Sequence, residues 1–168
     1  TVLLLRDQGL SLQQAAAGVG TMFIFGLVGK FGSGFLLLRM SLSRTWMLFL
    51  GLLLLGSVAL WQLPRVAHGP AIAMIGLGWG GCFPLVQLWI AAAFPGPNLA
   101  RVLGLFILLE TCGSAAGAWF TALMFDATGS YAVALATNVG LLVAAWIATL
   151  VSPPPRPGTP PLTGAPAT

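Results

Sequence analysis

The sequence predicts an all-α membrane protein with about five transmembrane helices. Of its 168 residues, 58% are hydrophobic and 6% are charged, and the mean hydropathy is +0.97. Soluble domains carry about 25% charged residues, so this chain lacks the polar side chains needed to cover itself in water. Uncharged stretches also separate the charges, with 22 residues between Asp7 and Lys30 and 32 residues from Gly69 to Ala100. Five stretches reach the roughly 20 apolar residues that a helix needs to cross the hydrocarbon core.

Turn and capping residues set the expected limits of these spans. Ser11 and Gln14 form a Ser-x-x-Gln capping box before the first span. Ser130 stands where its hydroxyl can cap the last one. Proline lacks an amide hydrogen, so the proline-rich residues after the last span are expected to form a disordered tail. The expected spans are 12–37, 45–63, 71–93, 99–125 and 130–151, and the tail is 152–168.

Basic residues in alternating loops predict the orientation of the chain. One side holds five basic residues, which are Lys30, Arg39, Arg44, Arg101 and Arg156. The other side holds two, Arg6 and Arg65. Lys and Arg are enriched in cytoplasmic loops. The chain is therefore expected to be a multi-pass protein of the cell (inner) membrane with a cytoplasmic C-terminus. It begins at Thr1 in an apolar run too short for a span, which predicts a preceding helix.

Small residues mark where the helices are expected to meet or bend. Lipid tails give helices no hydrophobic reason to associate, so close backbone contact must hold them together. Gly-x-x-x-Gly steps occur in the third and fourth spans, and a proline lies inside the third span. The proline is expected to kink its helix. The glycines serve either packing alone or a bendable helix that lines a moving cavity. The candidates are Gly76, Gly80, Pro84, Gly113 and Gly117.

Glu110 is the main candidate for chemistry, because an acid inside an apolar span is costly and should face the bundle interior or a wet cavity. Ser114 and Thr121 lie on its helical face, at steps of 4 and 11 residues. These residues are expected either to carry a coupled proton and contact substrate, or to be neutral packing groups. Gln87 is expected either to bind a polar substrate or to tie helices together.

Other polar side chains are assigned structural roles. Lys30 is expected to extend its ammonium towards the cytoplasmic surface, and Asn138 to tie helices together. Cys82 and Cys112 are interpreted as small packing residues. His68 has no second ligand nearby in the sequence, so no metal or cofactor is predicted. The scattered charges also predict that the protein is not an enzyme and has no nucleic-acid partner.

Several segments, taken in order, resemble the C-terminal half of a major facilitator superfamily transporter, in the branch of monocarboxylate and oxalate/formate carriers. Residues 29–39 resemble the cytoplasmic Gly-x-Leu-Ala-Asp-Arg signature, although Leu38 replaces its aspartate. Residues 76–84 resemble the glycine-rich tenth helix. Residues 7–16, 94–104 and 126–131 resemble loops of the family. The signature loop comprises Gly34, Arg39 and Arg44.

The resemblance implies an incomplete second six-helix bundle, made of the family's eighth to twelfth helices. It implies a secondary active transporter that moves a small organic solute by alternating access, coupled to protons or another ion, with an organic anion favoured. The expected partners are the solute, the ion, the lipid bilayer and a missing N-terminal half. The alternatives are a multidrug or metabolite efflux carrier of the same fold, a non-transporting membrane anchor subunit and, with less sequence support, a membrane-embedded enzyme.

Overall fold

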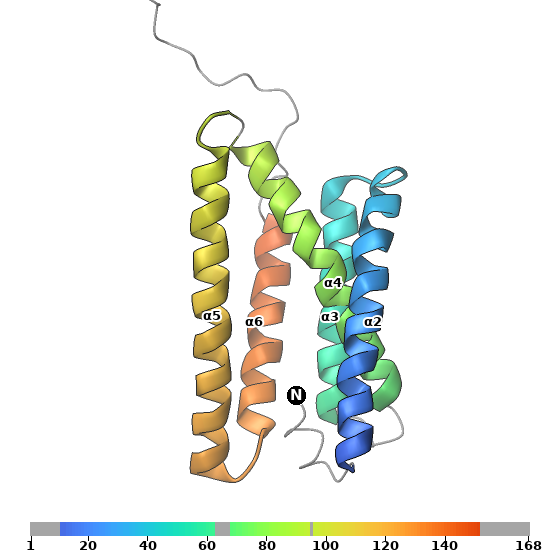
Figure 1. Cartoon of the computed structure of the whole chain (residues 1–168), viewed down its shortest axis with the longest axis vertical. Coiled ribbons are helices and arrows are strands. Elements are labelled where there is room, and N and C mark those ends of the chain that lie inside the picture. The colour runs from blue at the N-terminus through green and yellow to red at the C-terminus, as the bar shows by residue number, and fades with distance from the viewer. Residues whose placement is uncertain (1–10, 63–67, 95, 152–168) are drawn as a thin grey trace, which may run out of the picture.

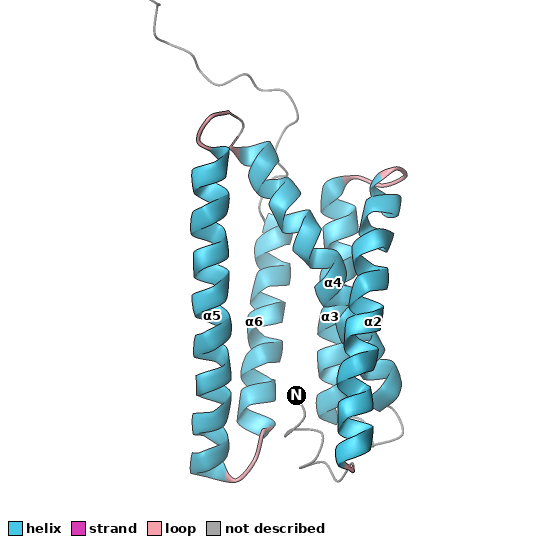
Figure 2. Ribbon diagram, viewed as in Figure 1, coloured by secondary structure: helices cyan, strands magenta, loops and turns pink. Residues whose placement is uncertain are grey.

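Five long helices make up the computed structural model, which describes residues 11–62, 68–94 and 96–151 (Figures 1 and 2). They are α2 (Leu12–Leu37), α3 (Leu42–Gln62), α4 (His68–Ala93), α5 (Leu99–Thr128) and α6 (Ala132–Val151). Each is long and apolar enough to cross a membrane, and the described residues form no strand. The prediction of an all-α, multi-pass membrane protein is confirmed.

Local capping explains three of the helix limits. The Ser11 hydroxyl accepts a hydrogen bond from the Gln14 backbone N–H at 3.2 Å, and the Gln14 side chain accepts one from the Ser11 N–H at 2.9 Å. This capping box starts α2 as the sequence predicts. Gly129 ends α5 with a φ of +66°, a left-handed conformation that glycine adopts without a Cβ penalty. The Ala132 N–H donates to the Ser130 hydroxyl at 3.2 Å, so Ser130 caps α6.

Two helices start earlier than the sequence spans suggest. Helix α3 begins at Leu42 rather than at residue 45, and α4 begins at His68 rather than at residue 71. Pro70 is the third residue of α4, where a missing amide hydrogen costs nothing because first-turn amides have no helical partner. The expected tail, 152–168, and most of the turn before α4 lie outside the described residues.

Helix α4 is the centre of the fold, because glycines on two of its faces let α2 and α3 approach closely. A Cβ on Gly76 or Gly80 would overlap the backbone of α2 at Met22 or Gly26. On the other face, a Cβ on Gly78 would lie 2.5 Å from the backbone nitrogen of Leu53 in α3. The helices therefore touch backbone to backbone, as the absence of a hydrophobic driving force in lipid requires.

Helices α5 and α6 form a looser pair beside this triplet (Figure 1). Neither helix contains a buried residue. Polar contacts fasten α6 to α3: the Trp46 indole N–H donates to the Thr149 hydroxyl at 3.1 Å, and the Asn138 amide donates to the Ser57 hydroxyl at 3.3 Å. In contrast, α5 meets α4 and α6 without such a bond among the described residues. Because α5 contains no buried residue, one long face of this helix is open.

The termini of the five helices lie at two opposite ends of the bundle (Figure 1). The basic end carries Arg39 between α2 and α3, Arg44 in the first turn of α3, and Arg101 at the start of α5. The far end carries His68 and the turn at Gly129. Near the basic end, α4 contains Pro84 and its upper part leans towards α5 (Figure 1). Proline cannot donate to the carbonyl one turn earlier, which weakens the helix at that turn.

Candidate functional site

A lysine lies within the apolar stretch of α2 and is exposed beside the contact between α2 and α4. Lys30 follows Gly29, whose missing side chain lets α2 contact α4 at Leu77 and Gly81. Lys30 is four residues from Gly26, which meets the middle of α4 at Gly80, and this separation corresponds to about 6 Å along the helix. Lys30 lies within the candidate membrane span Leu12–Leu37, seven residues before its last residue.

Two aromatic rings of α4 hold the Lys30 ammonium. Its Nζ atom lies 5.1 Å from the centre of the Phe83 ring and 5.8 Å from that of the Trp79 ring. Cations are attracted to the negative faces of such rings, most strongly to tryptophan. No carboxylate pairs with Lys30 among the residues that the structure describes. The outcome is an exposed positive charge that is held against two rings of α4. That this ammonium extends towards the cytoplasmic surface stays a prediction.

Trp79 also forms one wall of a cavity of about 350 Å³, which we call the Trp79 cavity. Aliphatic side chains from α2, α3, α4 and α6 form most of its lining, including Met22, Leu53 and Ile75. Its polar lining residues are Ser57 and Asn138, which are hydrogen-bonded to each other at 3.3 Å. Trp79 thus contacts the Lys30 ammonium and also lines an apolar cavity.

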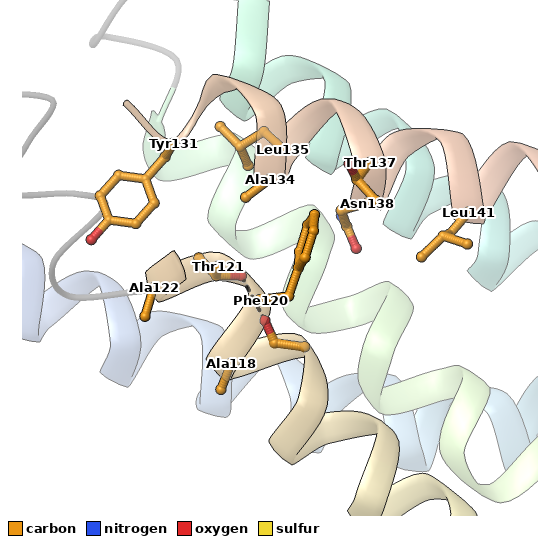
Figure 3. Close-up of a pocket in the computed structure, with 11 residues that line it drawn as sticks. Ala118, Phe120, Thr121, Ala122, Tyr131, Ala134, Leu135, Thr137, Asn138 and Leu141 are labelled. Atoms are coloured by element: carbon orange, nitrogen blue, oxygen red, sulfur yellow. Dashed lines mark hydrogen bonds between the residues drawn. The ribbon is translucent and has the colours of Figure 1, made fainter. Parts of the chain in front are cut away.

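A second cavity of about 500 Å³ lies between α5 and α6 and is called the α5–α6 cavity (Figure 3). Phe120 of α5 and Asn138 of α6 project into the space between the two helices (Figure 3). The hydroxyls of Thr121 and Thr137 each donate to a carbonyl of their own helix, so both are already satisfied. Leu135 and Asn138 line both cavities and therefore separate them.

The predicted substrate and coupling residues do not gather at one place. Thr121 lines the α5–α6 cavity, whereas Glu110, Ser114 and Gln87 line neither of the two cavities. Glu110 is half-buried on α5 and has no hydrogen-bond or ion-pair partner in the described part of the chain. Gln87 lies two helical turns beyond Gly80 on α4, towards the basic end. None of these three contacts Lys30 through a hydrogen bond or ion pair.

The glycine candidates fall into two groups. Gly76 and Gly80 lie at the α2–α4 contact, whereas nothing lies within 4 Å of the Cβ positions of Gly113 and Gly117. In the signature loop, Gly34 is equally open, and the Arg39 guanidinium lies 5.4 Å from the centre of the Phe35 ring. The loop and the α5 glycines are therefore exposed on this chain.

The side chains around Lys30 and the Trp79 cavity offer groups that can bind a solute. Among residues 11–62, 68–94 and 96–151, no three His, Cys, Asp or Glu side chains come together as a metal site. Near Lys30 and the Trp79 cavity, the described groups supply one cation, aromatic faces, aliphatic walls and an amide. Such a set can hold an anion and an apolar body in place.

Sequence reasoning missed the pairing of Lys30 with Trp79. The sequence places Lys30 near the cytoplasmic end of its span, but it does not show which side chains of the third span lie beside it. The available signal was its neighbour, Gly29, because Gly26 and Gly29 of α2 meet glycines of α4. Comparison with protein families, curated proteins and solved structures gives no match to this chain.

Proposed function

We propose that this chain is one bundle of a secondary active transporter of the major facilitator type, which moves a small organic anion by alternating access. The observation that carries the proposal is the Lys30 ammonium, which lies within the apolar span of α2 and is held on Trp79 and Phe83 without a carboxylate partner in the described chain. Ionisable residues at membrane depth are costly and mark substrate or ion pathways. An anionic solute would neutralise this charge while it is bound.

A second bundle would complete the carrier. Lys30 is exposed on one side of the α2–α4 contact, and α5 presents a face with no buried residue. Transporters of this kind place the substrate between two bundles, which rock about a site near the midplane. A non-transporting anchor needs no cavity and no unpaired charge within a membrane span, so the cavities and Lys30 favour the carrier.

Glu110 is our candidate for ion coupling, with Ser114, Thr121 and Gln87 as further polar contacts along the pathway. It is the acid within the apolar part of α5, and its side chain has no partner in the described chain. A carboxyl group on the open face of α5 can exchange a proton when the opposing bundle moves. We further propose that the basic end faces the cytoplasm of the cell (inner) membrane, since Lys and Arg favour that side.

Uptake into vesicles tests this proposal. The chain is produced together with its complementary bundle and reconstituted into lipid vesicles, and a radiolabelled monocarboxylate is added outside. We expect an imposed proton gradient to drive accumulation above the equilibrium level, and a protonophore to abolish it. Accumulation that is no greater than in empty vesicles, under gradients of protons and of sodium, would refute a secondary carrier of organic anions.

The same vesicles test the coupling role of Glu110. We expect Glu110→Gln to leave gradient-free exchange of the anion intact, because the amide still fits the site, and to remove gradient-driven accumulation. Thr111→Ala is the matched control, because Thr111 follows Glu110 and its hydroxyl bonds to its own helix at Ile107. If Glu110→Gln accumulates the anion with unchanged pH dependence, Glu110 has no part in coupling.

A further inference from the structure

We propose that the Trp79 cavity binds the uncharged part of the transported anion, and that Asn138 determines which anions are preferred. The inference rests on the proposed function, in which Lys30 binds the carboxylate. It names the substrate class as monocarboxylates with an aromatic or branched apolar body that ends in a hydroxyl or amide group. It also assigns a specificity role to α6, the helix whose Asn138 the sequence interprets as a structural tie.

The first argument concerns Trp79, which contacts the charged group of Lys30 and also lines the cavity. Its indole contacts the Lys30 ammonium at 5.8 Å from the ring centre and also lines the cavity. Phe23 packs edge-on against the same indole, with the ring centres 6.1 Å apart. A solute whose carboxylate lies at Lys30 is therefore beside an aromatic wall, and its apolar part can extend along that wall into the cavity.

The second step is the lining of the cavity, which selects for an apolar body. Its volume of about 350 Å³ accommodates a phenyl ring or a branched chain, and most of its walls are aliphatic side chains. A second carboxylate there would lose its hydration without a cation to replace it, since the described lining residues carry no charge. This disfavours dicarboxylates and favours monocarboxylates.

Asn138 provides the third step, because its hydrogen-bonding capacity is only partly used. An asparagine amide has two N–H donors and a carbonyl acceptor. One N–H of Asn138 donates to Ser57 at 3.3 Å, and the other groups have no partner among the described residues. Asn138 is exposed on this chain, so its carbonyl and its second N–H can accept a ligand that completes their hydrogen bonds. A hydroxyl group can do so by donating to the carbonyl.

The distance along α4 between the level of Ser57 and the level of Lys30 determines where this hydroxyl group must lie on the solute. Gly56, the neighbour of Ser57, faces Ala71 and Ile75 of α4, whereas Lys30 contacts Trp79 and Phe83. The middle of the first pair is eight residues from the middle of the second, which is about 12 Å along the helix. The carboxylate and the hydroxyl group must therefore lie at opposite ends of the solute.

The test compares phenylpropionate with its para-hydroxy derivative as competitors of monocarboxylate exchange in vesicles that contain the complete carrier. We expect the wild-type protein to prefer the hydroxylated compound about fivefold, as one net hydrogen bond provides. Asn138→Leu should abolish this preference while phenylpropionate still competes, which shows that the variant is folded. Ser57→Ala should keep the preference, because it removes the contact with α3 but not the amide.

The outcomes separate this inference from the proposed function. A wild-type protein without preference, or an Asn138→Leu variant that keeps it, would overturn the role of Asn138. A loss of preference in Thr137→Val, whose hydroxyl bonds to its own helix at Val133, would show that any change in α6 has this effect and would also overturn it. If Lys30→Gln still exchanges monocarboxylates, the proposed anion site fails, whatever the result at Asn138.

Discussion

Replacing Gly80 with alanine is expected to lower the free energy of unfolding by about 3 kcal/mol, at the upper end of the usual cost of overpacking. The new methyl group would overlap the carbonyl group of Gly26 in α2, which is backbone and cannot rotate away. Helices α2 and α4 would have to separate along a contact that holds the centre of the fold together. Thermal or denaturant unfolding of the purified protein in detergent micelles measures this change.

Gly104→Ala is the matched control for Gly80→Ala. Gly104 lies within α5, and nothing lies within 4 Å of its Cβ position. Since alanine favours a helix more than glycine does, this variant should be more stable by about 0.5–1 kcal/mol. Equal and small effects of the two substitutions would contradict the close packing of α2 on α4.

Lys30→Gln is expected to reduce the kcat/KM for uptake of an organic anion about 100-fold. Removal of one member of a desolvated charge pair commonly costs several kcal/mol, and glutamine offers the anion no charge. Lys30→Arg should retain a larger part of the activity, because the guanidinium keeps the charge and also stacks on aromatic rings. Initial rates of uptake over a range of substrate concentrations provide the measurement.

Arg101→Gln controls for the loss of one positive charge, because Arg101 is exposed at the start of α5. It should leave kcat/KM unchanged. Lys30 is exposed on this chain, so Lys30→Gln should also leave the thermal stability nearly unchanged. A Lys30→Gln variant that is stable and transports the anion at the wild-type rate would exclude this residue from the anion site.

The fold was predictable because membrane spans depend on length and hydropathy. Absence of charge over bilayer-length stretches was enough to predict five helices. The capping box at Ser11 and the cap at Ser130 are local patterns and appear in the structure as predicted. The early starts of α3 and α4 were missed because apolar length does not record where the first helical turn begins outside the core.

The site was harder to predict, because it depends on which faces of the helices meet. The Gly76-x-x-x-Gly80 step indicated close packing but not its partner, which is α2. The similar step at Gly113 and Gly117 meets nothing in the described chain. Sequence alone therefore could not show that Lys30 reaches Trp79, or that Asn138 lies between two cavities. These arrangements follow from rotation of the helices about their axes.

The most direct test of the five-span fold is the sidedness of two loops. Cys82 and Cys112 are replaced by alanine, and single cysteines are introduced at Ser41, between α2 and α3, or at Ser130, between α5 and α6. Three helices, α3 to α5, separate these positions along the chain. We predict that a membrane-impermeant maleimide labels the two cysteines from opposite sides of sealed vesicles. Labelling of both from the same side would contradict a chain in which every helix crosses the membrane.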